Sequence, residues 1–418
     1  MPGPRGAGIR GQAATTGSRR SRAGPGSGAV GGRVHDGGMS VTIDITGLAA
    51  AGDGLGTGDA GRWRRVSFTP SPLAELGMAL HALSEPGHHP RLRGWATAVT
   101  AGLDPGLADR LCEADFLWRT TFSDVFAPFA GIPGGRARPG ATLAEELDQL
   151  DGLTDQQFVH AALEFTCQLR YDVADPGPLD DPVMRRRSLE LAAARGVVQE
   201  RFTRRLLEDP PAVRAWFRQL LLDCDEAFFA DTWARLRPEL AADARHRTDL
   251  LRRKGLGEAL SSLSGAVSLD EEAGLITVDK LLVGRTATGD GGLVLVPTSL
   301  GWPHLLVLHR YGWQPTLTYP VSGSHPEAPS VEQLTLRLEA LAHPVRMRLC
   351  RHLARAAHTT GELAQAHGMS APEISRHLAV LRRAGLITSG RRGRYVQHQL
   401  DLSVVARLGT DFIEGVLR

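Results

Sequence analysis

Apolar residues recur at the three- and four-residue spacing of amphipathic helices throughout residues 62–263. Thr142, Thr154 and Asp209 stand directly before such periods and are suitable N-cap residues. One segment, "RAWFRQLLLDCDEAFFADTWARL", is apolar around much of its circumference, which is typical of a buried helix. The pattern therefore predicts a helical domain built around a central core helix.

From residue 265 onward the spacing of apolar residues shortens. "GLITVD", "GGLVLVPTS", "HLLVLHR" and "PTLTYPV" are short, rich in Val, Leu and Thr, and separated by Gly, Pro and Asp. Such runs predict strands, and we expect a small antiparallel sheet in residues 265–320. "SGSHPEAPS" has the composition of a linker and predicts a domain boundary near residue 325.

Residues 1–60 are of low complexity, with stretches such as "GPGSGAVGGRVHDGG" and "GLAAAGDGLGTGDAG". Their apolar content is too small to offset the conformational entropy lost on folding, so we expect a disordered tail. Met1 and Met39 are both candidates for the start of translation. The glycines of "GDGLGTG" do not form a nucleotide loop, because no hydrophobic strand precedes them and no helix follows.

The last ninety residues contain a succession of short helical patterns. Val331, Leu334, Leu338 and Leu341 form an apolar stripe, and a second helix starts at Pro344. "TTGELAQAHG" predicts a third helix, with Thr359 and Glu362 as its capping box and Gly368 at its C-terminal end. Ser370 and Glu373 form a second capping box, which begins a fourth helix. Two short helices joined by a Gly-Met-Ser turn predict a helix-turn-helix.

The fourth helix has two distinct faces. At about 100° per residue, Ile374, Leu378 and Leu381 fall on one side and predict a buried stripe. Arg376 and Arg383 fall on the opposite side with Ala379 between them, while Ser375 and Arg382 lie on a flank. A small, basic outer face offers donors for phosphates and base edges, as a helix in the major groove requires.

Behind this helix, "LITSGRRGRYVQHQL" alternates as two strands around a turn that carries Arg391, Arg392 and Arg394. A two-stranded ribbon with arginines at its tip is typical of a wing that contacts the DNA backbone or minor groove. The last helix, "LSVVARLGTDFIEGVL", repeats apolar residues every four positions and predicts a partner, either the first helix or a second subunit.

Charge is distributed unevenly along the chain. The formal net charge of +2 divides into +6 for residues 330–418, +5 for residues 1–40 and −9 for residues 41–329. A basic end joined to an acidic body indicates that the end meets a polyanion. The four cysteines form no C-x-x-C pair, and no apolar run reaches the length of a membrane helix. We therefore expect a cytoplasmic, nucleoid-associated protein without a membrane partner.

The C-terminal succession resembles the ArsR family of bacterial winged helix-turn-helix repressors. The matching stretches are "LEALAHPVRMRLCRHLA", "TTGELAQAHGMSAPEISRHLAVLRRAGLI" and "GRRGRYVQHQL". The resemblance implies a homodimer formed by the first and last helices, bound to an inverted-repeat operator. It also implies base contacts from Ser375, Arg376 and His377, and a wing that includes Tyr395.

The chain departs from the metal-sensing members of that family. The third helix has no Cys, the last helix has no His, and Cys350 stands alone on the second helix. We therefore expect no metal site of that type. We expect effector sensing to take place in residues 61–325 instead. That region is similar to an uncharacterised domain found ahead of such modules in high-GC bacteria.

The body offers no clear catalytic constellation. His88 and His89 are metal-ligand types, but no further ligands stand at a useful spacing, so we expect a surface loop. "LSSLSG" lacks the frame of a nucleophile elbow, and "GRTATGDGG" lacks the lysine of a phosphate loop. We expect no enzyme activity, no cofactor and no metal.

The predicted fold is mainly α with small antiparallel β elements. It divides into a tail (1–60), a mostly helical regulatory or dimerisation domain (61–325) and a winged helix-turn-helix (326–418). The predicted function is a DNA-binding transcriptional regulator, expected to be a repressor, that acts as a homodimer and responds to an unidentified small-molecule effector. The alternatives are an enzyme, or a protein-interaction domain, that carries a basic C-terminal module. The expected DNA-binding residues are Ser370, Glu373, Ser375, Arg376, His377, Arg382, Arg383, Arg391, Arg392, Arg394 and Tyr395.

Overall fold

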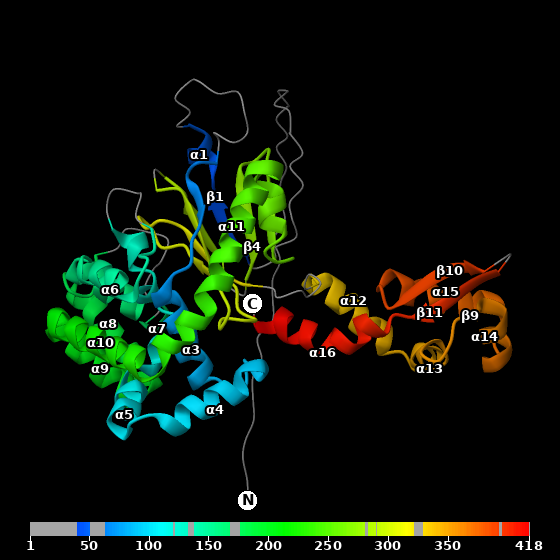
Figure 1. The fold of residues 1–418 in the computed structure, drawn as a ribbon, viewed down its shortest axis with the longest axis horizontal. Helices are drawn as coiled ribbons and strands as arrows, with labels where there is room; N and C mark the ends of the chain where they lie inside the picture. Colours follow the sequence, from blue (N-terminus) through cyan, green and yellow to red (C-terminus); the bar gives the residue numbers. More distant parts are fainter. Residues whose placement is uncertain are drawn as a thin grey trace, which may run out of the picture. The chain divides into compact units, whose positions relative to one another are not determined.

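The computed structural model describes residues 40–50, 63–119, 122–132, 138–167, 176–280, 283–289, 291–321, 329–392 and 395–417. Its elements are mostly helices, with three small sheets (Figure 1). This confirms the predicted fold class, a mainly helical chain that ends in a winged helix-turn-helix. Among the described residues no helix is both long and apolar enough to span a bilayer.

The helices of the body are α1 (Thr46–Ala50), α3 (Pro72–Ser84), α4 (Arg93–Gly102), α5 (Pro105–Ala114), α6 (Leu143–Asp151), α7 (Asp155–Cys167), α8 (Pro182–Arg195), α9 (Val197–Glu208), α10 (Pro210–Cys224) and α11 (Ala230–Ser261). Short 3-10 turns lie at Pro90–Leu92, Asp115–Leu117, Asp124–Phe126 and Pro128–Gly131. The three predicted N-caps are confirmed: Thr142, Thr154 and Asp209 each accept a hydrogen bond from a backbone N–H of the first turn.

The predicted core helix is confirmed as α10, which continues through a π-helical turn (Asp225–Phe229) into α11. Phe217, Leu221, Cys224 and Phe229 are fully buried along it. In Figure 1, α11 runs beside the strands, and Leu251, Leu256 and Leu260 of this helix share a core with the sheets. Helix α11 therefore packs against both body sheets and forms one side of the core that they share.

The strands of the body are β1 (Ser40–Asp44), β2 (Val66–Phe68), β3 (Val267–Asp270), β4 (Leu275–Asp279), β5 (Gly284–Ala287), β6 (Leu293–Thr298), β7 (Leu306–Leu308) and β8 (Thr316–Pro320). They form two sheets, with orders β3-β4-β1-β5 and β2-β6-β8-β7. The prediction of one antiparallel sheet is wrong in two respects. There are two sheets, and β1–β5, β2–β6 and β6–β8 are parallel pairs.

The assignment of residues 1–60 to a disordered tail is wrong for β1. Val41 and Ile43 are each 1% exposed, and β1 pairs with β4 on one side and β5 on the other. The alternation of Val41 and Ile43 with polar neighbours places both apolar side chains on the core face. The rest of the predicted tail lies outside the described residues, apart from α1.

Buried carboxyl groups connect the helices of the body to each other and to the sheet. Glu146 of α6 is fully buried and accepts hydrogen bonds from the Ser71 hydroxyl and the Leu73 N–H at the start of α3. Glu75 of α3 accepts from the N–H groups of Ser299 and Leu300 behind β6. Burial raises the pKa of Glu75 to about 7 and that of Glu146 to about 8.

Replacing Glu75 by glutamine should flatten the dependence of stability on pH. A carboxyl whose pKa rises on folding binds its proton more tightly in the folded state. Its contribution to the free energy of unfolding is complete below pH 4.5 and is lost as the pH rises through about 7. The shift from 4.5 to about 7 then costs about 3 kcal/mol of stability at pH 8, where the group is ionised. Glutamine keeps the acceptor oxygen but cannot ionise.

Urea denaturation of wild type and Glu75→Gln at pH 5 and pH 8 measures the difference. The wild type should lose more stability than the variant between these pH values, while Glu271→Gln, at an exposed position, should behave as wild type. Equal losses in all three proteins would show that Glu75 is ionised throughout.

The C-terminal module consists of α12 (Val331–Leu341), α13 (Pro344–Leu353), β9 (His358–Thr359), α14 (Thr360–His367), α15 (Ala371–Arg383), β10 (Ile387–Arg392), β11 (Tyr395–Leu400) and α16 (Leu402–Leu417). Its core contains Leu349, Leu353 and Leu363 together with the buried side of α15. The predicted four helices, wing and terminal helix therefore all form.

Candidate nucleic-acid interface

The turn between α14 and α15 is built by two capping boxes and one glycine. Thr359 accepts from the N–H of Glu362 at the start of α14, and Glu362 accepts from the N–H of Thr359 in return. Gly368 ends α14 in the left-handed conformation (φ 62°), which costs glycine little and other residues more. The chain can therefore reverse direction between the end of α14 and Ser370, which is the N-cap of α15.

Ser370 and Glu373 are engaged with each other at the start of α15. The Ser370 hydroxyl and backbone N–H both donate to the Glu373 carboxylate, at 2.7 and 3.0 Å. These hydrogen bonds hold the pKa of Glu373 below its usual value, so the cap is present at neutral pH. Both residues therefore have a structural role in the cap of α15, and a contact of either with DNA stays a prediction.

The two faces of α15 lie as the sequence predicts. Ile374, Leu378 and Leu381 are at most 1% exposed and pack into the core of the module. On the other side an exposed row runs along the helix, made of Ser375, Arg376, Ala379, Arg382 and Arg383. The helix is thus anchored by its aliphatic stripe, and its hydroxyl and guanidinium groups are accessible to a ligand.

His377 lies at the border between these faces. It is half-buried, and its ring centroid is 5.0 Å from that of His343, the N-cap of α13. Burial, followed by His343 and Arg346, lowers the pKa of His377. At neutral pH this side chain is therefore uncharged, and it can offer a hydrogen bond but no counter-charge to a phosphate.

The wing is a regular hairpin. β10 and β11 pair from Ile387↔Leu400 to Arg392↔Tyr395, and Figure 1 shows them beside α15. Arg391 is exposed near the tip. Arg394 lies outside the described residues, and of Arg392 and Tyr395 the structure describes the backbone pairing alone. The predicted wing therefore forms, and one of its arginines is seen on the surface.

His398 was not predicted, yet it joins the wing to α14. It is 3% exposed, and its Nδ1 lies 2.8 Å from the Ser389 hydroxyl on β10. Its Nε2 lies 3.4 Å from the Thr360 hydroxyl at the first position of α14. The alternation of Val396, His398 and Leu400 puts this histidine on the face that includes buried Leu400, which is the signal that the sequence offered.

Helices α12 and α16 meet through a buried ionic cluster. Asp411 of α16 is 3% exposed and accepts hydrogen bonds from Arg337 of α12 at 2.7 Å and from Arg407 at 3.2 Å. Two guanidinium partners compensate the cost of burying this carboxylate. Asp411 therefore fixes how α16 lies on α12.

The same two helices expose apolar side chains. Val331 and Leu338 of α12 are 38% and 40% exposed, and Phe412 and Val416 of α16 are 47% and 52% exposed. Among the described residues of α16, Asp411 alone is buried. An apolar helix that buries so little of its own surface is typical of an interface with another chain.

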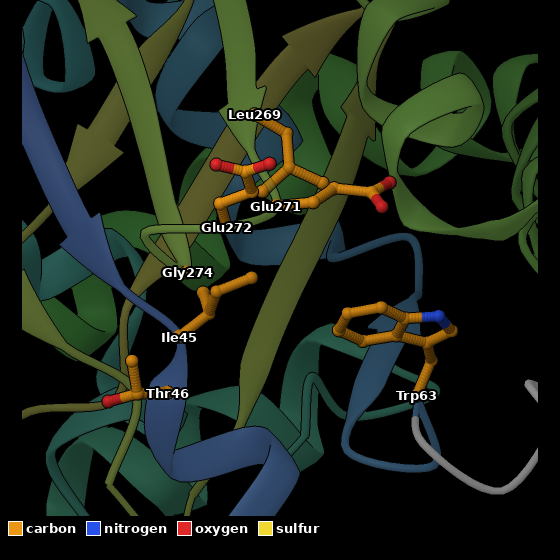
Figure 2. A pocket seen from close by; sticks show the side chains of 7 residues that line it. All are labelled: Ile45, Thr46, Trp63, Leu269, Glu271, Glu272 and Gly274. Carbon is orange, nitrogen blue, oxygen red and sulfur yellow. The ribbon is translucent and has the colours of Figure 1, made fainter.

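A small pocket lies between β1, β2 and the turn after β3 (Figure 2). Ile45 and Thr46 line it on one side and Trp63 on the opposite side, and Glu271 and Glu272 lie above them in this view. Its volume is about 150 Å³. Sites for small organic molecules usually measure about 300–1,000 Å³, so this pocket alone does not identify an effector.

The prediction of a surface loop at His88 and His89 is wrong. His89 is 1% exposed, and His88 is half-buried. Both approach His81 of α3 and His304, which lies between β6 and β7. The sequence could not show this convergence, because His304 is more than two hundred residues away along the chain.

Comparison with known proteins gives two family matches. The model of a family of unknown function, DUF5937, matches residues 39–325, and the model of a helix-turn-helix domain matches residues 341–390. The first match covers the body with both of its sheets, including β1, and the second covers α13 to the middle of β10.

The C-terminal module is similar to several known proteins. The biofilm growth-associated repressor of Agrobacterium fabrum is 33% identical over 76 residues, which are 18% of this chain and 65% of that protein. The transcriptional repressor SdpR of Bacillus subtilis is 30% identical over 67 residues, 16% of this chain and 74% of the relative. A crystal structure of a possible transcriptional regulator for arsenical resistance is 38% identical, with a TM-score of 0.17, and the match covers 18% and 79% of the two chains.

Proposed function

We propose a function on the premise that this chain belongs to the DUF5937 family of unknown function over residues 39–325 and ends in a winged helix-turn-helix module of the ArsR type. In this proposal the protein is a transcriptional repressor that binds DNA as a homodimer on an inverted repeat. Residues 39–325 supply dimerisation, effector sensing or both. The protein acts on the nucleoid in the cytoplasm.

The outer face of α15 carries the proposal. Ser375, Arg376 and Arg383 are exposed over a fully buried aliphatic stripe, so the helix can enter a major groove without losing its packing. Arginine can donate two hydrogen bonds to the O6 and N7 of guanine. The hydroxyl of Ser375 can either donate to or accept from a base edge. His377 then contributes a neutral hydrogen-bonding group at the edge of this surface.

The exposed apolar residues of α12 and α16 support the homodimer. They lie on the two helices that Asp411 holds together, so a second copy could bury all four side chains in one surface. A twofold dimer presents two copies of α15, which fits an operator with two half-sites one helical turn apart. The names of two relatives describe repressors, which favours repression over activation.

DNase I footprinting of the region upstream of the protein's own gene tests the proposal. We expect protection of an inverted repeat at nanomolar protein concentration, a range typical of specific repressors. Protection of no site, or uniform protection of all DNA, would contradict a sequence-specific regulator. An enzyme or a protein-interaction domain that carries a basic tail would give the uniform pattern.

Replacing Arg391 by alanine should weaken binding to operator and unrelated DNA alike. A wing arginine that contacts phosphate releases counterions regardless of sequence, so its loss should reduce the slope of log K against log salt by about 1. Fluorescence anisotropy at several salt concentrations measures this slope. Arg252→Ala removes the same charge from the exposed surface of α11 and should leave the slope unchanged. A selective loss of operator binding would instead identify Arg391 as a base contact.

A further inference from the structure

Four histidine side chains converge inside the body, between α3, the loop that follows it and the segment between β6 and β7. The ring centroids of His81 and His304 are 4.7 Å apart, and those of His89 and His304 are 5.2 Å apart. One ring nitrogen from each of His81, His88 and His304 lies within 4.8 Å of the other two. Neutral imidazole is the side chain that most often binds transition metals in proteins.

Hydrogen bonds to two carbonyl groups fix which nitrogens face the centre of the cluster. Nδ1 of His81 lies 2.7 Å from the Trp118 carbonyl oxygen, and Nδ1 of His304 lies 2.7 Å from that of Leu417. A carbonyl oxygen can only accept, so each Nδ1 carries the proton of its ring. The Nε2 atoms therefore both present lone pairs, and they are 3.1 Å apart. Two lone pairs at this distance repel each other unless a cation lies against both.

A shared proton could bridge only the two Nε2 atoms of His81 and His304. A metal ion differs from a proton here because it can take lone pairs from several rings at once.

His88 and His89 have nitrogens available to complete such a site. Nδ1 of His88 is buried without a hydrogen bond. His89 is 1% exposed, and neither of its ring nitrogens makes a normal hydrogen bond, although the Trp302 backbone lies close enough to favour the protonated ring. Buried polar atoms are almost always paired in native structures, so these nitrogens point to a ligand that they can bind.

We propose that His81, His88 and His304, with His89 as a fourth donor or as a support, bind a first-row transition-metal dication such as Zn²⁺. Two nitrogens at Zn–N distances of about 2.0–2.1 Å in tetrahedral geometry are about 3.3 Å apart, close to the 3.1 Å between His81 and His304. The Nδ1–H donations to carbonyl groups are the usual support of metal-bound histidines. A set of imidazoles without a carboxylate disfavours Mg²⁺ and Ca²⁺, which prefer oxygen ligands.

Titration of the full chain with Co²⁺, after removal of metals by a chelator, tests the site. We expect one Co²⁺ per chain with the visible absorption of tetrahedral Co²⁺, and displacement of this signal by Zn²⁺. His88→Ala and His304→Ala should each weaken Co²⁺ binding by at least about 10-fold, since loss of a supporting group alone costs about 10–100-fold. His88 makes no hydrogen bond through Nδ1 and is half-buried, so its substitution should leave the fold intact.

Two matched variants separate this site from other histidines. His246→Ala changes an exposed histidine of α11, and His352→Ala breaks the 2.9 Å pair that His352 forms with His367 in the C-terminal module. Both should bind Co²⁺ as the wild type does. The proposal is overturned by absence of saturable binding, by unchanged affinity in His88→Ala, or by loss of binding in His352→Ala alone. If His304→Ala does not fold by circular dichroism, His88→Ala decides the outcome.

Discussion

Replacing Phe412 by aspartate is expected to convert the protein from a dimer to a monomer and to lower its operator affinity by about 100-fold or more. Phe412 is 47% exposed on α16, beside Val416 one turn further along. Large aromatic side chains at the centre of an interface commonly contribute at least about 2 kcal/mol, and a buried unpaired carboxylate adds a desolvation cost. A monomer also holds one half-site at a time and loses the gain from simultaneous contacts.

Analytical ultracentrifugation and fluorescence anisotropy on the same samples measure the two effects. Val183→Asp is the matched control, because Val183 is a 64% exposed valine on α8 of the body. This control should remain dimeric and bind the operator normally. A dimeric Phe412→Asp protein would show that the subunits associate through another surface, and a monomeric wild type would exclude the proposed dimer.

Replacing Arg376 by alanine should weaken operator binding by about 10–100-fold, which corresponds to about 1–3 kcal/mol. The side chain is exposed at the middle of the outer face of α15, directly opposite the buried stripe of Ile374 and Leu378. A bidentate contact with guanine contributes about this much to discrimination between bases. Binding to unrelated DNA should fall much less, since that binding depends on total charge.

A competition assay with operator and unrelated DNA separates these two losses. Arg252→Ala removes an equal charge from the body and should change neither. The melting temperature of Arg376→Ala should match that of the wild type, because Arg376 is exposed and is not a member of the hydrophobic core of the module. Equal weakening on both DNAs would assign Arg376 to the phosphate backbone and leave another residue to read bases.

The sequence predicts the C-terminal module well because its structure depends on short-range interactions. The capping boxes at Thr359 and Ser370 each span four residues, and the buried stripe of α15 is visible within about two helical turns. The wing follows from alternation around one turn. Each of these features is encoded within about fifteen residues, so the pattern of one sequence is sufficient.

The features that the sequence did not predict depend on contacts between distant segments. β1 is five residues long in a glycine-rich context, and its partners β4 and β5 lie more than two hundred residues away. Nothing in residues 40–44 alone specifies those partners. The histidine cluster has the same origin, because His304 comes close to His81 and His88 only after β6 is placed beside α3. Asp411 looks like one of many charged residues until α12 packs against α16.

Methylation interference at guanine N7, on the operator found by footprinting, tests the central claim most directly. The N7 atom faces the major groove, where α15 should lie. We predict two groups of interfering guanines about 10 base pairs apart, one for each copy of α15. In Arg376→Ala at least one guanine in each group should stop interfering. Tight binding that no N7 methylation disturbs would contradict the account, because the outer face of α15 would then not lie in the major groove.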